Sequence, residues 1–241
     1  MIIAAKDVQE QSRFMEYVMG NIARKVGRLH RWQERFWGRR YRAIPILDDD
    51  ALVQRMRYVL SNGVKEGLVA EPGLWPGVHV VDVFTKGRKL EGVWYDRTRE
   101  YQRRRRGVAF AEDEFATVYP VHIATLPFLE GQTPEQQRRY YCDMVESAGC
   151  EAREALKASG KVPIGRRRVL KRKPHHRPKP IAKRPAPLCH TTQRALRCGF
   201  RTAYRDFVQG YRDALKHWAS TAAASMFPNS CLLPSMVGGF P

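Results

Sequence analysis

The segment from Asp48 to Gly63 is the part of the chain whose structure the sequence constrains most tightly. It opens with three consecutive aspartates, which suit the positive end of a helix dipole. Gly63 suits the residue that follows the last turn of a helix. At 100° per residue the apolar side chains fall on one stripe, which consists of Leu52, Val53, Met56, Val59 and Leu60. The pattern predicts an amphipathic helix that ends at Gly63.

Tyr58 falls nearly opposite this apolar stripe. Its neighbours one turn away on the predicted helix are Gln54, Arg55 and Asn62. A tyrosine that serves packing belongs on the stripe, whereas this one is predicted to project from a polar, basic face. Its hydroxyl could meet a phosphate there. The alternative is an ordinary exposed helix tyrosine without a function.

The charge of the chain is +19 and is distributed unevenly. Residues 161–241 hold 17 of the 43 Lys and Arg residues but only 2 of the 24 Asp and Glu residues. By Coulomb attraction and counterion release, such a region favours a polyanionic partner. A charge run that only aids solubility is the alternative. An anionic membrane is disfavoured because no apolar anchor accompanies the basic stretch.

The sequence gives little support for a membrane protein, a disulfide-bonded protein or a zinc protein. No apolar run approaches the roughly 18–20 residues that span a bilayer. The five cysteines lack CxxC spacing, which indicates reduced thiols. Cys189 and His190, with His175 and His176, lack the closer ligand pairs that tetrahedral zinc requires. We expect a cytoplasmic, nucleoid-associated protein.

The predicted fold class is α+β, mainly helical with a small sheet. Four regions are expected: 1–85 with the tyrosine helix, a mixed or helical extension over 86–160, a basic proline-rich linker over 161–190, and a terminal helix with an irregular tail over 191–241. The remaining expected elements are a helix opened by a capping box at Asp7–Glu10 with a core-facing apolar stripe, a short edge strand at Ala43–Leu47, a strand at Val78–Phe84, an extended piece at Gly92–Arg97, a basic loop at Arg103–Arg106, a helix from Thr133 to about Ser159, and a helix over roughly 191–220.

Aromatic and cationic residues alternate between positions 32 and 42. Phosphate contacts from arginine and stacking of unpaired bases on aromatic rings are typical of single-strand binding. For the rings, packing between helix and sheet is the alternative. The residues concerned are Trp32, Phe36, Trp37 and Tyr41 with Arg35, Arg39, Arg40 and Arg42.

Residues 12–80 contain three motifs in a characteristic order. The first is Phe36-Trp37-Gly38-Arg39-Arg40-Tyr41-Arg42-Ala43. The second runs from Arg57-Tyr58-Val59-Leu60-Ser61-Asn62-Gly63 through Val64-Lys65-Glu66-Gly67-Leu68-Val69, and the third is Trp75-Pro76-Gly77. In these motifs the chain resembles the C-terminal half of the REP-associated tyrosine transposases, which are single-tyrosine members of the HUH endonuclease superfamily.

The resemblance implies a fold, a chemistry and a set of site residues. The fold would be a ferredoxin-like HUH domain that lacks its first strands. Tyr58 matches the nucleophile that attacks a DNA phosphodiester and forms a 5′-phosphotyrosine link. Asn62 matches a third ligand to Mg²⁺ or Mn²⁺, and one helical turn separates it from Tyr58. The DNA would be single-stranded or a hairpin, and the expected contacts to it come from Trp32, Arg35, Arg39, Arg40, Arg42, Arg55 and Lys65.

The sequence departs from the family in its histidines. The family holds its metal with a His-hydrophobic-His pair upstream, and no His-x-His occurs here. The adjacent pair His175-His176 would point to opposite faces of a strand. Met1 is therefore expected to be a start inside a longer ancestral frame. The missing strands should leave a sheet edge exposed, which favours a homodimer.

Three hypotheses follow. The leading one is a transposase-derived DNA-binding protein that does not cleave DNA alone. The second is an active transposase whose histidine pair comes from a missing segment or a partner chain. The third is a non-catalytic RNA- or DNA-binding protein that uses only its basic region 161–241.

Overall fold

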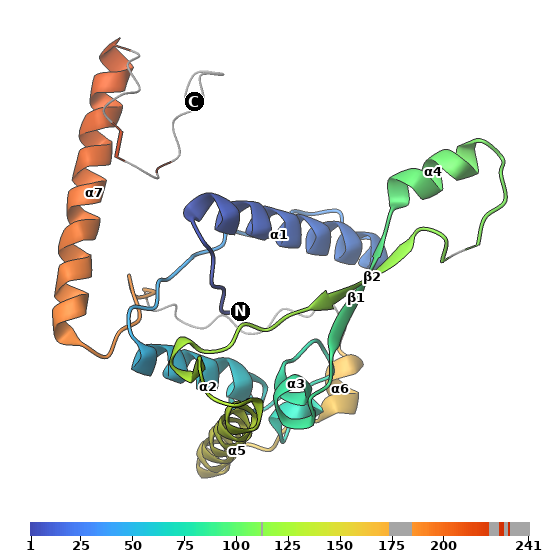
Figure 1. Cartoon of the computed structure of the whole chain (residues 1–241), viewed down its shortest axis with the longest axis horizontal. Helices are drawn as coiled ribbons and strands as arrows, with labels where there is room; N and C mark the ends of the chain where they lie inside the picture. The colour runs from blue at the N-terminus through green and yellow to red at the C-terminus, as the bar shows by residue number, and fades with distance from the viewer. Residues whose placement is uncertain (112, 174–184, 222–226, 229–230, 232–241) are drawn as a thin grey trace. The chain divides into compact units, whose positions relative to one another are not determined.

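The computed structural model describes residues 1–111, 113–173, 185–221, 227–228 and 231 (Figure 1). The fold is α+β and mostly helical, as predicted, and the described residues contain one two-stranded antiparallel sheet. Two units divide the chain: residues 1–55 with the described part of 174–241, and residues 56–173. The elements are α1 (Val8–His30), α2 (Asp49–Lys65), η1 (Pro72–Leu74), α3 (Val81–Lys86), β1 (Leu90–Tyr95), α4 (Arg97–Arg105), β2 (Ala116–Val121), η2 (Pro127–Leu129), α5 (Pro134–Ala158), α6 (Arg166–Leu170) and α7 (Arg194–Thr221).

Helix α1 begins at its predicted cap but does not form a core. The Asp7 side chain accepts a hydrogen bond from the backbone N–H of Glu10 at 2.7 Å, whereas the Glu10 carboxylate accepts from Lys6 instead of completing a capping box. No residue of α1 is buried, and Leu29 is 75% exposed. The predicted core-facing stripe is therefore wrong. The irregular segment after α1 covers only part of its apolar face, with Trp37 donating a hydrogen bond to the Met19 carbonyl.

Asp48 joins two distant parts of the first unit. Its carboxylate accepts from the backbone N–H of Ala51 at 2.7 Å, which caps the start of α2. It also accepts from the Thr191 hydroxyl and from the backbone N–H of Thr192 at 2.9 Å. These hydrogen bonds, that from Thr191 foremost, lower the pKa of Asp48 to about 2.

The segment before Asp48 forms less sheet than predicted. A single parallel bridge joins Ile46 to His190, with the His190 N–H donating to the Pro45 carbonyl at 2.8 Å. The expected strand at 43–47 is thus reduced to one bridge. Pro45 has no N–H to extend a ladder, and the chain turns into α2 at Asp48.

Helix α2 ends later in the chain than predicted. The helix continues through Gly63 to Lys65, and Gly67 (φ 65°) takes the left-handed position. The N–H of Gly67 bonds the Val64 carbonyl at 2.8 Å and that of Leu68 bonds the Gly63 carbonyl at 2.9 Å. This is a Schellman arrangement. Gly67, not Gly63, is therefore the residue that closes the helix.

The core of the second unit centres on four fully buried side chains: Leu60, Val64, Val69 and Leu129. Helix α5 starts as predicted, with Thr133 and Gln136 forming a complete capping box. Helix α3 packs on α5, and the rings of Phe84 and Tyr141 stack at 4.2 Å. The Val78–Phe84 segment was predicted as a strand and this was wrong, because packing of Val81 and Phe84, one turn apart, selects a helix.

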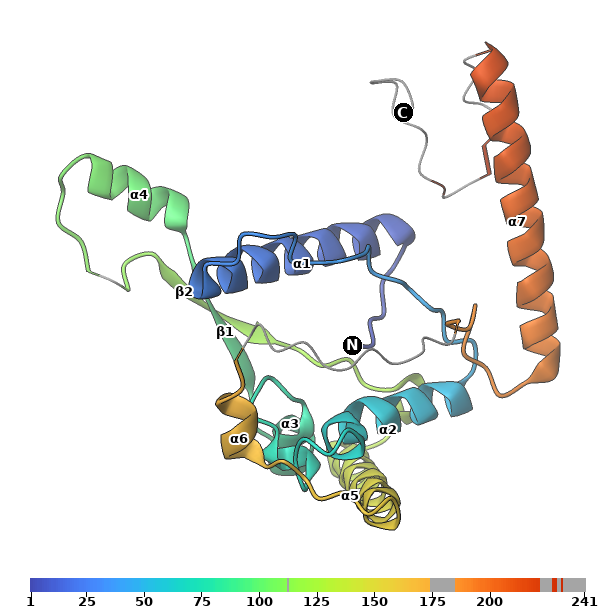
Figure 2. The same cartoon turned by 180° about the vertical axis from the view of Figure 1, so that it is seen from behind.

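Strands β1 and β2 form an antiparallel hairpin, with Leu90 opposite Val121 and Tyr95 opposite Ala116. Figure 1 and Figure 2 show α4 inserted between the two strands at the end of this hairpin. The predicted basic loop at 103–106 is largely helix instead, because Asp96 caps α4 and Glu100 pairs with Arg97 and Arg104. The predicted extended piece at 92–97 overlaps β1.

Within the described residues, no helix has both the length and the apolar character needed to cross a bilayer.

Asp48 should stabilise the protein in a pH-dependent way. Its folded-state pKa lies below the ordinary 3.8, so its contribution is present above pH 3.8 and is lost as the pH falls toward 2. We expect Asp48→Asn to lower the melting temperature at neutral pH, with the difference from the wild type shrinking through that acidic interval. Asp49→Asn, on the exposed neighbour, is the control. Equal losses in the two variants, measured by circular dichroism, would contradict the role of Asp48.

Two Gly→Ala substitutions should change stability in opposite directions. Gly67→Ala forces a side chain into the left-handed region at φ 65° and should cost about 1–2 kcal/mol. Gly20→Ala lies inside α1 with open space around the new Cβ, and should add about 0.5–1 kcal/mol. Urea unfolding measures both values. A Gly67→Ala protein as stable as the wild type would refute the assigned helix ending.

Candidate nucleic-acid interface on helix α2

Tyr58 lies on the exposed face of α2. Its side chain is 45% exposed, whereas Leu60, two positions later, is 1% exposed. The Lys65 ammonium lies 5.3 Å from the centroid of the Tyr58 ring, within the range of a cation–π contact. Asn62 and Lys65 are also exposed. The predicted orientation of Tyr58 is confirmed, and Lys65 supplies a positive charge beside its ring.

Contacts on another side of α2 fix its rotation. Arg57 donates to the Ser147 hydroxyl at 2.7 Å and forms an ion pair with Glu151, both on α5. Ser61, itself buried, donates to the Arg57 carbonyl. Because Arg57 and the buried residues hold α2 against the core, the helix cannot turn Tyr58 inward without breaking them.

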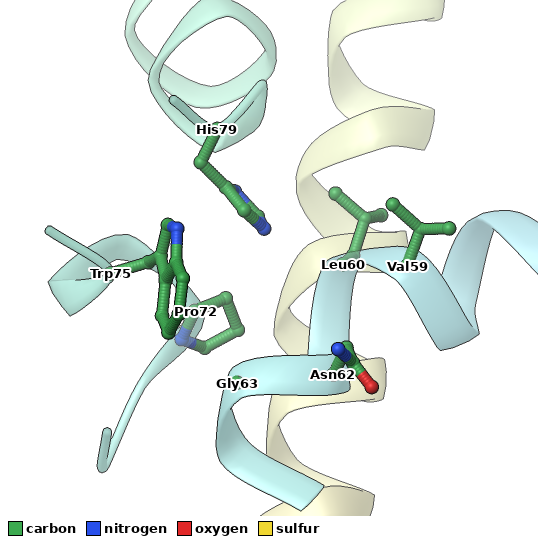
Figure 3. Close-up of a pocket in the computed structure, with 7 residues that line it drawn as sticks. All are labelled: Val59, Leu60, Asn62, Gly63, Pro72, Trp75 and His79. Carbon is green, nitrogen blue, oxygen red and sulfur yellow. The ribbon is translucent and has the colours of Figure 1, made fainter. Parts of the chain in front are cut away.

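A cavity of about 180 Å³ lies beside the end of α2 (Figure 3). The side chains of Trp75 and His79 point toward α2 in this view. The residues that line it are Val59, Leu60, Asn62, Gly63, Pro72, Trp75 and His79.

Trp75 contacts two glycines closely. A Cβ on Gly63 would lie 3.2 Å from the Trp75 ring, and one on Gly77 would lie 2.8 Å from the indole nitrogen. Trp75 also packs against the buried Val64 and Val69. Residues from the second and third sequence motifs therefore form one packed structure around the end of α2.

His79 has a structural role that the sequence did not indicate. Its Nδ1 accepts from the Val81 N–H at 3.3 Å, and the ring also hydrogen-bonds the Val59 backbone. Burial lowers the pKa of His79, while the Val59 bond and the charge of Asp82 oppose this shift. His79 thus links the start of α3 to α2. No spacing pattern in the sequence reveals this contact.

The residues around Asn62 do not fit a metal site. Among the residues that the structure describes, no three His, Cys, Asp or Glu side chains are grouped to hold an ion. His79, which lines the cavity with Asn62, uses its ring in the contacts above. His175 and His176 lie outside the described residues.

The other predicted nucleic-acid contacts lie in the first unit. Arg35, Arg39, Arg40 and Arg42 are exposed, and none pairs with a carboxylate of the described residues. The aromatic residues among them cluster: Phe36 contacts Trp32 at 6.0 Å and Trp37 at 4.8 Å between ring centroids. For Trp37, the packing interpretation fits its hydrogen bond to α1.

Arg55 lies on α2 one turn before Tyr58 and is half-buried. The pKa of His190 is lowered by burial and, to a smaller extent, by the charge of Arg55. Arg55 therefore contributes positive charge near the start of α2, while Tyr58, Asn62 and Lys65 form the exposed group toward its end.

No protein-family model, curated protein or solved structure matches this chain.

Proposed function

We propose that this protein binds single-stranded or hairpin DNA through the exposed Tyr58 face of α2 and does not cleave DNA by itself. In this proposal, the chain is a remnant of a ferredoxin-like HUH domain related to the tyrosine transposases. The observation that carries the proposal is the exposed Tyr58 ring beside Lys65, on a helix whose rotation the core fixes.

Each group on this face has a part in DNA binding. The Lys65 ammonium neutralises a phosphate, and the Asn62 amide and the Tyr58 hydroxyl donate hydrogen bonds to phosphate oxygens. The exposed face of the Tyr58 ring stacks on an unpaired base. Arg35, Arg39, Arg40 and Arg42 add phosphate contacts that do not depend on base sequence.

An active transposase is the alternative in which a missing segment or a partner chain supplies the histidine pair. The phenolic oxygen of Tyr58 would then form a bond to phosphorus while the bond from phosphorus to the 3′ oxygen breaks. The phenol loses its proton to solvent and the 3′ oxygen gains one. A second copy of this chain cannot supply that pair, because the sequence contains no His-x-His; the partner would have to be a different chain.

Incubation with a labelled single-stranded DNA hairpin and Mg²⁺ or Mn²⁺ separates binding from cleavage. We expect a complex on a native gel and no covalent adduct on a denaturing gel. Tyr58→Ala should weaken this binding by about 1–3 kcal/mol through lost stacking, and Tyr17→Ala, on the exposed surface of α1, is the control. A covalent adduct that Tyr58→Phe abolishes would show instead that the chain is an autonomous nuclease.

The second candidate function is nucleic-acid binding by the basic region alone, and the charge of residues 161–241 favours it. We expect the triple variant Arg39→Gln, Arg40→Gln, Arg42→Gln to lower hairpin affinity. The slope of log affinity against log salt should fall by about two, at roughly 0.7 per single-strand phosphate contact. Fluorescence anisotropy measures both.

The matched control removes three arginines that already pair with glutamates, namely Arg97, Arg103 and Arg104. If both triple variants bind as the wild type does, the arginines at 39–42 make no contact and the basic region becomes the binding element.

A further inference from the structure

Helix α7 (Arg194–Thr221) has three chemically distinct faces. At about 100° per residue, its six basic side chains fall within a sector of about 100°; they are Arg194, Arg197, Arg201, Arg205, Arg212 and Lys216. We call this sector the cationic stripe. The large apolar side chains occupy a second sector, made of Leu196, Phe200, Tyr204, Phe207, Tyr211, Leu215 and Trp218. Asp206 and Asp213 lie on the third face.

The cationic stripe is exposed and is not neutralised by any carboxylate of the described residues. All six side chains are exposed, and none forms an ion pair with a carboxylate in the part of the chain that the structure describes. Arg197 donates one hydrogen bond to the Thr191 carbonyl. Asp213 accepts from Gln209 on the third face. By contrast, Arg97, Arg103 and Arg104 on and beside α4 pair with glutamates.

This arrangement costs the isolated helix some stability. Arg197, Arg201 and Arg205 succeed one another at a spacing of four residues, and like charges at that spacing on a helix repel one another. A bound polyanion removes this repulsion and gains counterion-release free energy. Binding of a polyanion to the stripe therefore stabilises α7.

The length of the stripe is comparable with one turn of a DNA duplex. From Arg194 to Lys216 the helix rises about 33 Å, at 1.5 Å per residue. That length equals the axial rise of about ten base pairs, at 3.4 Å each. Five of the six cations are arginines, whose planar guanidinium groups bind phosphate oxygens in a bidentate manner.

We propose that the cationic stripe of α7 binds the phosphate backbone of DNA. It is a second binding surface, separate from the Tyr58 face, and the choice of DNA over RNA rests on the proposed function. An anionic membrane fits less well. A helix that lies on a membrane places cations on the polar face opposite its apolar face, whereas here the cationic stripe borders the apolar sector and the aspartates lie on the remaining face.

A permutation within α7 tests the stripe at constant composition and charge. The variant exchanges neighbours in two places: Arg201→Thr with Thr202→Arg, and Arg205→Asp with Asp206→Arg. Each exchange moves a cation about 100° around the helix. The matched control makes two exchanges on α1: Ser12→Arg with Arg13→Ser, and Ala23→Arg with Arg24→Ala. Circular dichroism checks that both full-length proteins keep their helicity.

The measured quantity is the affinity for the labelled DNA hairpin between about 50 and 200 mM salt. We expect the α7 permutation to weaken binding at least about tenfold near 100 mM salt and to reduce the salt slope by about two, at roughly 0.9 per duplex phosphate contact. The α1 permutation should bind as the wild type does. An unchanged affinity and slope in the α7 permutation overturn the proposal.

Three further outcomes distinguish the alternatives. If the α7 permutation binds DNA normally but loses binding to phosphatidylserine vesicles, the stripe is a membrane surface and the DNA assignment falls. If it binds normally while the Arg39, Arg40 and Arg42 variant does not, the α7 assignment fails and the proposed function stands. If the α7 permutation alone weakens binding, the stripe is supported and the contribution of the arginines at 39–42 is refuted.

Discussion

The contact of Trp75 with Gly63 determines how α2 ends, and the orientation of Tyr58 depends on it. A Cβ at position 63 would lie 3.2 Å from both the indole ring and the Val69 side chain, so glycine lets Trp75 and Val69 pack closely against the helix. With Trp75 in place, Val64 and Val69 are fully buried, and the chain leaves the helix through the left-handed Gly67. The ion pair of Arg57 with Glu151 holds the same helix against α5. Tyr58 is left on the face that none of these contacts covers.

The Tyr58 face and the cationic stripe of α7 differ in their chemistry. The Tyr58 face combines a ring, an amide and a single ammonium, which suits an unpaired base and its phosphate. The cationic stripe of α7 consists of cations alone, which suits a continuous backbone irrespective of base sequence.

The sequence predicted what local spacing determines. The periodicity of α2 placed Tyr58 and Asn62 on the exposed face, and the Thr133 capping box located the start of α5. The predictions failed where contacts between residues far apart in the sequence determine the local structure. Val78–Phe84 is rich in β-branched residues, yet Phe84 stacks on Tyr141 and the segment forms α3. Gly63 was mistaken for the helix ending, because the close packing of Val69 and Trp75, six and twelve residues later, explains the glycine at that position. The links of His79 to α2 and of Asp48 to Thr191 are likewise long-range.

Photo-crosslinking tests the central claim most directly. The full-length protein would be bound to a DNA hairpin that carries 5-iodouracil at its unpaired positions, irradiated, digested and analysed by mass spectrometry. The account predicts a nucleotide attached at Tyr58, and loss of that crosslink in Gly63→Leu, which displaces Trp75 and disturbs the end of α2. Crosslinks confined to other segments, with Tyr58 unmodified in a complex that is fully formed, would contradict it.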